Sequence, residues 1–181
     1  MKELNFLLER KHIDFKPAQA YRRGDSVECT ILAYKDARTD MDILDDKVGS
    51  DNWQNEYKRD SKGVLQCGIG IFSEERGEWI WKWSNGTPSD FESEKGEYSD
   101  AFKRAGFMWG IGRCLYEFPL IRIQLMDNEW SDNNGKIKVN AWFRPNDFMW
   151  KISGEIGDLH IQCAQKFGNS WKTRFDNKPN K

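Results

Sequence analysis

Side chains of the types used in enzymatic chemistry are few and scattered in this sequence. The chain has two histidines, His12 and His160, and four cysteines without a Cys-x-x-Cys pair. Neither a histidine-based catalytic site nor a zinc site is therefore expected. The sequence also contains no phosphate-binding loop, no G-x-G-x-x-G fingerprint and no G-x-S-x-G nucleophile motif. These patterns favour a binding protein over an enzyme, without a cofactor or a metal.

One enzymatic alternative stays open, a metal-dependent nuclease that combines an acidic residue with an (Asp/Glu)-x-Lys tripeptide. The tripeptides 56–58 and 60–62 fit this pattern, with Asp45 or Asp46 upstream. The same tripeptide also begins at Glu9, Asp14, Asp45 and Asp176. Because about a third of the chain is charged, such matches are expected by chance, and the binding interpretation is preferred.

The stretch SDAFKRAGFMWGIGRCLY (99–116) has helical spacing, but it carries a Lys–Arg pair and glycines at 106, 110 and 112. Glycine in a helix interior costs up to about 1 kcal/mol relative to alanine. One arc of this helix is expected to pack on a sheet: Tyr98, Ala101, Phe102, Ala105, Met108, Trp109 and Gly112. Lys103, Phe107 and Ile111 lie on the opposite side, with Arg104 on the flank.

Two explanations remain open for the apolar residues Phe107 and Ile111 on that outward side. They are either ordinary surface apolar residues, which a terminal hairpin could cover, or part of a second interface with another subunit or with DNA. Glycines 106 and 110 lie one turn apart on one flank, where they would let another backbone approach closely.

The hydrophobic pattern predicts an α+β fold. In chain order, the expected elements are a short helix at 4–10, a strand at 26–34, a helix from an Asp36 N-cap to Gly49, strands at 53–59, 64–72 and 78–84, a long helix from 89 or 90 to about 112, and strands at 121–127 and 136–143. The architecture is thus an antiparallel three-stranded meander packed on a long helix, with a preceding helix and a C-terminal β-hairpin.

Tryptophans 79, 81 and 83 alternate along the last strand of this meander and therefore share one face. We expect this row to pack beneath a helix, with stacking against nucleic-acid bases as the alternative. Residues 1–165 are predicted to form one domain. Residues 166–181 contain five basic residues, one acid, Trp171 and Phe175, and are predicted to be either a flexible tail or an auxiliary DNA or partner contact.

The chain of 181 residues has 28 basic and 29 acidic residues and a net charge of −1. Nucleic-acid-binding proteins are often basic overall, so any phosphate-binding surface here must be a local patch. No signal peptide or long apolar segment is present, which predicts a cytoplasmic protein without a membrane partner.

Three segments together resemble the Rad-fifty-two (Rad52) family of single-strand annealing proteins, most closely its phage Sak-type branch. They are YKDARTDMDILDDKVGSDNW, EWIWKWSNG and SEKGEYSDAFKRAGFMWGIGRCLY. Order, spacing and residue types match over about residues 30–117, and the last block is the most specific. Eukaryotic members carry a further Arg where this chain has Phe107, and they continue into a partner-binding region.

The resemblance implies an ATP-independent protein that forms a multi-subunit ring, with single-stranded DNA held by its phosphates in a basic groove. By this resemblance Lys103 and Arg104 are expected to line the groove, with Lys95 and Arg38 as further candidates. Lys58, Arg59 and Lys82 are candidate replacements for the missing Arg. Phe107 and Ile111 are the candidate oligomer interface.

Annealing of complementary strands in recombination and repair is therefore the predicted function. The expected partners are single-stranded DNA, further copies of the chain and a host or phage single-strand-binding protein. The expected location is the cytoplasm, that of the bacterial host if a phage encodes the chain. Besides the nuclease, a protein that only coats single strands is the alternative.

Overall fold

The computed structural model describes residues 3–87 and 93–178, and of residues 93–95 it describes the backbone alone. The contacts form two compact units, and the single domain over 1–165 stays a prediction. The first unit comprises Met1–Leu7 and Lys35–Cys114, and the second comprises Leu8–Tyr34 and Leu115–Lys181. The fold is α+β with mostly antiparallel strands, as predicted. None of the described helices is long and apolar enough to cross a membrane.

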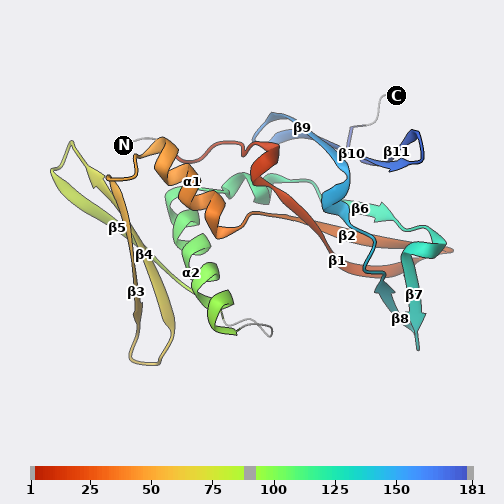
Figure 1. The fold of residues 1–181 in the computed structure, drawn as a ribbon, viewed down its shortest axis with the longest axis horizontal. Coiled ribbons are helices and arrows are strands. Elements are labelled where there is room, and N and C mark those ends of the chain that lie inside the picture. The colour runs from red at the N-terminus through yellow and green to blue at the C-terminus, as the bar shows by residue number, and fades with distance from the viewer. Residues whose placement is uncertain (1–2, 88–92, 179–181) are drawn as a thin grey trace. The chain divides into compact units, whose positions relative to one another are not determined.

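The first unit is a three-stranded antiparallel sheet with two helices (Figure 1). Its elements are α1 (Ala37–Lys47), β3 (Trp53–Arg59), β4 (Leu65–Ser73), β5 (Glu78–Asn85) and α2 (Ser93–Trp109). The predicted meander is confirmed to within two residues at each strand end. The predicted start of the long helix at 89 or 90 lies outside the described residues.

Local signals explain α1. The Asp36 carboxylate accepts a hydrogen bond from the Thr39 amide (2.9 Å), which satisfies a donor that the first turn leaves free. Gly49 has a φ of 101°, a left-handed conformation that ends the helix at little steric cost. Ile43 and Leu44 are the buried apolar residues of this helix.

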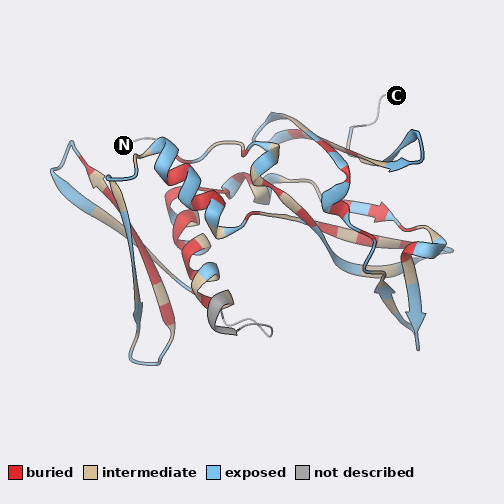
Figure 2. Cartoon of the chain, in the orientation of Figure 1, coloured by how far each residue is buried: buried red, intermediate tan, exposed pale blue. Residues whose placement is uncertain are grey.

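Helix α2 packs on β4 and β5, and many of the first unit's buried residues lie in β4 and along α2 (Figure 2). Ala101, Phe102, Ala105 and Trp109 are buried, as predicted for this arc. Met108 is 44% exposed, so its assignment to the core was wrong. It lies at the margin of the arc, and one sheet covers only part of the helix surface.

The second unit is built from strands. They are β1 (Asp14–Arg23), β2 (Ser26–Tyr34), β6 (Ile121–Gln124), β7 (Trp130–Asn133), β8 (Lys136–Val139), β9 (Met149–Glu155), β10 (Asp158–Phe167) and β11 (Ser170–Asp176). Their sheets have the orders β1-β2-β6, β7-β8 and β11-β10-β9. The described part of segment 4–10 is not an α-helix, which corrects the prediction, and a short 3-10 helix follows at Arg10–His12.

The C-terminal hairpin differs from the predicted one. Strand β6 pairs with β2, far away in the sequence, while β7 and β8 form the hairpin. Asn134 and Gly135 both have positive φ, which is the geometry of a two-residue type I′ turn. The position of the turn was therefore predicted correctly. The strand before it was predicted at 121–127 instead of Trp130–Asn133, because pairing of distant segments leaves no local signal.

Residues 166–178 are folded as the end of β10 and as β11, rather than forming a free tail. Strand β11 pairs with β10, and Arg174, whose side chain is only 4% exposed, anchors it. Its guanidinium donates to both carboxylate oxygens of Glu129 at 2.9 and 2.6 Å and to the Gln124 carbonyl at 2.9 Å. A buried charge of this kind is tolerated only with such partners.

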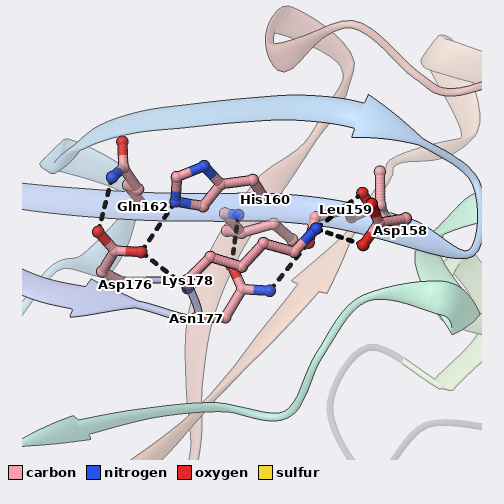
Figure 3. A network of polar contacts seen from close by, with 8 residues as sticks. Asp158, Leu159, His160, Gln162, Asp176, Asn177 and Lys178 are labelled. Atoms are coloured by element: carbon pink, nitrogen blue, oxygen red, sulfur yellow. Dashed lines mark hydrogen bonds and ion pairs between the residues drawn. The ribbon is translucent and has the colours of Figure 1, made fainter. Parts of the chain in front are cut away.

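A polar network ties the following residues to β10 (Figure 3). The Asn177 amide accepts from the Ile161 backbone at 2.7 Å and donates to the Leu159 carbonyl at 2.9 Å, which continues the strand pairing through a side chain. Asp176 lies 2.9 Å from His160 Nε2 and accepts from Gln162. The network holds Asp176 and Asn177 against β10.

Replacing Arg174 with Met should destabilise the protein by about 3–5 kcal/mol, because the Glu129 carboxylate would remain buried without its partner. Chemical denaturation followed by circular dichroism measures this. Trp171→Ala, at an exposed position of the same strand, should change stability by less than about 0.5 kcal/mol. Equal stability of the two variants would mean that the segment is a tail after all.

Candidate nucleic-acid interface

Lys103 and Arg104 lie on the side of α2 that faces away from the buried arc. Arg104 is exposed, and its Nε donates to the Asp100 carboxylate at 2.7 Å, one helical turn earlier. Asp100 also accepts from the Thr87 amide at 3.0 Å. Lys103 is half-buried and has no hydrogen-bond or ion-pair partner within the described part of the chain. Arg104 is therefore accessible to an external anion, and Lys103 is partly accessible.

A buried ion pair lies beneath this side of α2. The Lys35 ammonium donates to both carboxylate oxygens of Asp40, and the two residues are 8% and 0% exposed. A Cβ at Gly106 would lie 2.7 Å from Asp40 Oδ2, and one at Gly112 would overlap the Lys35 stem. These two glycines therefore make room for a buried charged pair. The sequence had suggested close approach of DNA or another subunit at Gly106.

Gly110 has a different neighbour. Its φ is 113°, and a Cβ there would lie 3.0 Å from the Asn5 backbone nitrogen. The close backbone approach predicted for Gly110 is thus made by the chain's own N-terminal segment. The three glycines of the stretch are explained by contacts inside the first unit.

Burial dominates the electrostatics of the ion pair. It raises the pKa of Asp40 to about 6, because loss of hydration outweighs the attraction of Lys35. Burial likewise lowers the pKa of Lys35. Lys103 is close enough to act on both pKa values, lowering that of Asp40 by attraction and that of Lys35 by repulsion. The candidate DNA contact is thus electrostatically coupled to the pair.

Two further cations gather at the C-terminal end of α2. Lys82 Nζ donates to the Met108 carbonyl at 3.0 Å and lies 4.2 Å from the centre of the Trp109 ring. Arg113 donates to the carbonyls of Phe107 and Met108 at 2.9 and 3.0 Å. Loss of hydration, followed by repulsion from Arg113, lowers the pKa of Lys82. Both side chains satisfy carbonyls that the helix end leaves free.

Sequence reasoning selected Lys82 as a DNA contact and missed Arg113. The available signal was the position of Arg113 directly after the glycines that end the helix, where basic residues commonly bind the last carbonyls. Lys82 is placed to hold α2 on β5, which is a packing role.

The other candidate cations come from three further places in the first unit. Arg59 donates to the Glu97 carboxylate of α2 at 3.0 Å and to the Gly63 carbonyl at 2.9 Å. Arg38 is exposed on α1. Lys95 belongs to the first turn of α2, but its side chain lies outside the described residues.

Lys58 points to the other face of the sheet. Cross-strand partners in an antiparallel pair share a face, and Arg59 pairs with buried Leu65 while Lys58 pairs with Gln66. Lys58 Nζ lies 3.6 Å from the centre of the Trp83 ring. The predicted site residues of the first unit are therefore distributed over both faces of its sheet.

The predicted interface residues Phe107 and Ile111 behave differently from each other. Ile111 is 0% exposed, so its side chain is not available to a second subunit in this structure. The helix ends at Trp109, and the turn at Gly110 directs Ile111 inward. Phe107 is half-buried, with the Arg113 guanidinium 5.4 Å from its ring centre.

Two acids of the nuclease alternative, Asp45 and Asp60, have structural partners. Asp45 accepts from the Trp53 indole at 2.7 Å, and Asp60 accepts from the amides of Lys62 and Val64 at 2.9 Å each. Over residues 3–87 and 93–178, no three His, Cys, Asp or Glu side chains converge to hold a metal ion. The geometry of these acids gives the nuclease alternative no support.

The first unit is thus an antiparallel sheet with α2 on one face, and this helix carries the exposed Arg104 and the half-buried Lys103. Residues 62–133 match the model of the Rad52/22 family double-strand break repair protein. The match includes β4, β5 and α2 and leaves α1 and β3 outside. No curated protein and no solved structure matches the chain. The family predicted from the sequence is supported over this part of the chain.

Proposed function

We propose that the chain binds single-stranded DNA and anneals complementary strands during homologous recombination and repair. The observation that carries this proposal is the family match over 62–133, which includes the Lys103–Arg104 pair of α2. The two cations would neutralise phosphates, which supply most of the sequence-independent affinity for nucleic acid. Annealing itself breaks no covalent bond. We propose that it proceeds without ATP, since this sequence contains no phosphate-binding loop.

We also propose that the active form is an oligomeric ring, as the resemblance to the phage Sak-type branch implies. One copy offers only a few cations on α2, whereas repetition around a ring multiplies them along the DNA strand. Phe107 remains a proposed subunit contact, and Ile111 does not, because it is buried. A single-strand-binding protein of the host or phage is the proposed additional partner.

Two alternatives differ in what they do to DNA. A nuclease shortens its substrate and needs a divalent metal. A coating protein binds single strands but slows or merely protects their pairing. An annealing protein accelerates pairing, works in a chelator and leaves strand lengths unchanged.

The test is a strand-annealing assay with EDTA and without nucleotide, in which product lengths are read on a denaturing gel. We expect faster pairing and unchanged strand lengths. Binding without acceleration would indicate a coating protein. Metal-dependent shortening would indicate a nuclease.

Mass photometry at the same protein concentration tests the ring. We expect one dominant species at an integral multiple of the 21.3 kDa subunit mass. A species of single-subunit mass that retains full annealing activity would contradict the ring and leave the annealing function intact.

A further inference from the structure

The tryptophan row of β5 lies on the face of the sheet opposite α2, which corrects the prediction that a helix covers it. Helix α2 lies on the face that carries Lys82, since Lys82 Nζ donates to the Met108 carbonyl at 3.0 Å and lies 4.2 Å from the centre of the Trp109 ring. Ile69 of β4 pairs with Lys82 and shares this face. Trp81 and Trp83 alternate with Lys82 and therefore lie on the other side.

Two glycines of β4 let these indoles lie flat on the sheet. Gly68 pairs with Trp83 and Gly70 with Trp81. A Cβ at Gly68 would lie 2.6–2.7 Å from three atoms around the centre of the Trp83 indole, and one at Gly70 would lie 2.8–3.0 Å from the same atoms of Trp81. Contact with central ring atoms means that one face of each ring rests on the glycine. The other face of each ring points away from the sheet.

The two rings together form a nearly continuous aromatic floor. Their centres are 5.8 Å apart and their planes differ by 23°. Both residues are half-buried, as expected for rings covered on one side. Trp79, at the end of the same row, meets Phe72 edge-on with ring centres 5.5 Å apart.

The border of the floor is polar. Gln54 and Gln66 share this face, as do Glu56 and Lys58, whose charges balance. The Lys58 ammonium occupies the outward face of Trp83 at 3.6 Å from the ring centre. A ligand for this surface therefore needs flat π-faces more than it needs charge, and a phosphate near the floor would have Lys58 within reach.

From this geometry we propose that the aromatic floor of Trp81 and Trp83 binds unpaired nucleobases of single-stranded DNA by stacking. The proposal rests on the proposed single-strand binding and adds a second surface to it, separate from Lys103 and Arg104. Stacking uses the flat face of a base and leaves its Watson–Crick edge free, so it is compatible with pairing. When a base covers Trp83, the Lys58 ammonium must leave the ring. We expect it then to pair with the phosphate of that nucleotide.

The test compares two strands with the same number of phosphates, a 30-nucleotide oligothymidylate and an abasic strand of equal length. Stacking is worth about 1–3 kcal/mol per base, so the wild-type chain should bind the thymidylate strand at least about tenfold more tightly. Trp81→Leu keeps Gly70 covered but removes the π-face. It should lose about tenfold in affinity for the thymidylate strand and nothing for the abasic strand.

Two variants serve as controls. Trp81→Phe should retain most of the affinity, because a smaller flat ring remains. Trp142→Leu, at a 51% exposed tryptophan of the second unit, should bind both strands like the wild type. Thermal unfolding and mass photometry of each variant monitor folding and assembly.

The outcomes separate this proposal from the proposed function. If the wild-type chain binds both strands equally, no stacking takes place and the aromatic floor is not a base-binding surface, whatever the variants do. Equal loss for both strands in Trp81→Leu together with altered assembly would make the floor a contact between copies of the chain. Binding of neither strand by the wild type would instead overturn the proposed function itself.

Discussion

Replacing Lys103 and Arg104 together with alanine should leave a folded protein that hardly binds or anneals single-stranded DNA. Charge-assisted contacts are worth about 1.5–3 kcal/mol each, so losing two should weaken binding by about a hundredfold or more. Each lost phosphate contact should also reduce the slope of log affinity against log salt by roughly 0.7. The loss should be nearly the same for every base sequence, because phosphate contacts carry no sequence information.

The fold should survive this double replacement. Neither side chain belongs to the buried arc of α2, and alanine is the best helix former. Asp100 loses its partner Arg104 but still accepts the Thr87 amide, and an exposed ion pair contributes at most about 1 kcal/mol.

Lys136→Ala with Lys138→Ala is the matched control for the pair, since it removes two exposed cations from β8. Binding titrations at several salt concentrations distinguish the two double variants. If the Lys103/Arg104 variant folds, assembles and anneals like the wild type with the same salt dependence, α2 is not the phosphate site.

The parts of the fold that the sequence predicts correctly are those with local signals. The Asp36 cap and Gly49 bound α1, and short connectors between alternating segments reveal the β3–β4–β5 meander. Strand β1 and the pairing of β6 with β2 were not predicted. Strand β1 pairs with the adjacent β2, but it buries only Phe15, so it has no clear alternation. Strands β2 and β6 are far apart in the sequence, which leaves no local signal for their pairing.

The candidate site was predictable in its residues but not in their arrangement. Alternation shows that Trp79, Trp81 and Trp83 share a face, but it does not say which face meets a helix. The α2 side of β5 carries Ile80, Lys82 and Ser84, which is less apolar than the tryptophan side. The helix lies on this side because it packs against the buried apolar residues of the neighbouring strand β4. A pattern within one strand cannot reveal this.

The glycines at 106 and 112 illustrate the same limit. Glycine in a helix indicates that something approaches closely, and this inference from the sequence was correct. What approaches is a buried Lys–Asp pair at Gly106 and Gly112, and a lysine in the core is rare enough that composition argues against it. Only the three-dimensional contacts identify the neighbour.

Lys35→Met should therefore destabilise the protein strongly, by about 3–5 kcal/mol, because the fully buried Asp40 carboxylate would lose its partner. Met keeps the length of the Lys35 stem against Gly112. Urea denaturation measures the change. The matched control is Lys11→Met, which breaks an exposed ion pair with Glu9 and should cost less than about 1 kcal/mol.

Replacing both partners, as Lys35→Met with Asp40→Val, should restore most of the lost stability, because no charge then remains buried. Apolar replacements of a buried pair are often neutral or stabilising. The double variant should also anneal DNA normally, since the pair lies beneath α2 while Lys103 and Arg104 remain at its surface. A double variant as unstable as Lys35→Met alone would show that shape, not the charge pair, sets the packing against Gly106 and Gly112. Normal stability with lost annealing would instead make the pair part of the DNA site.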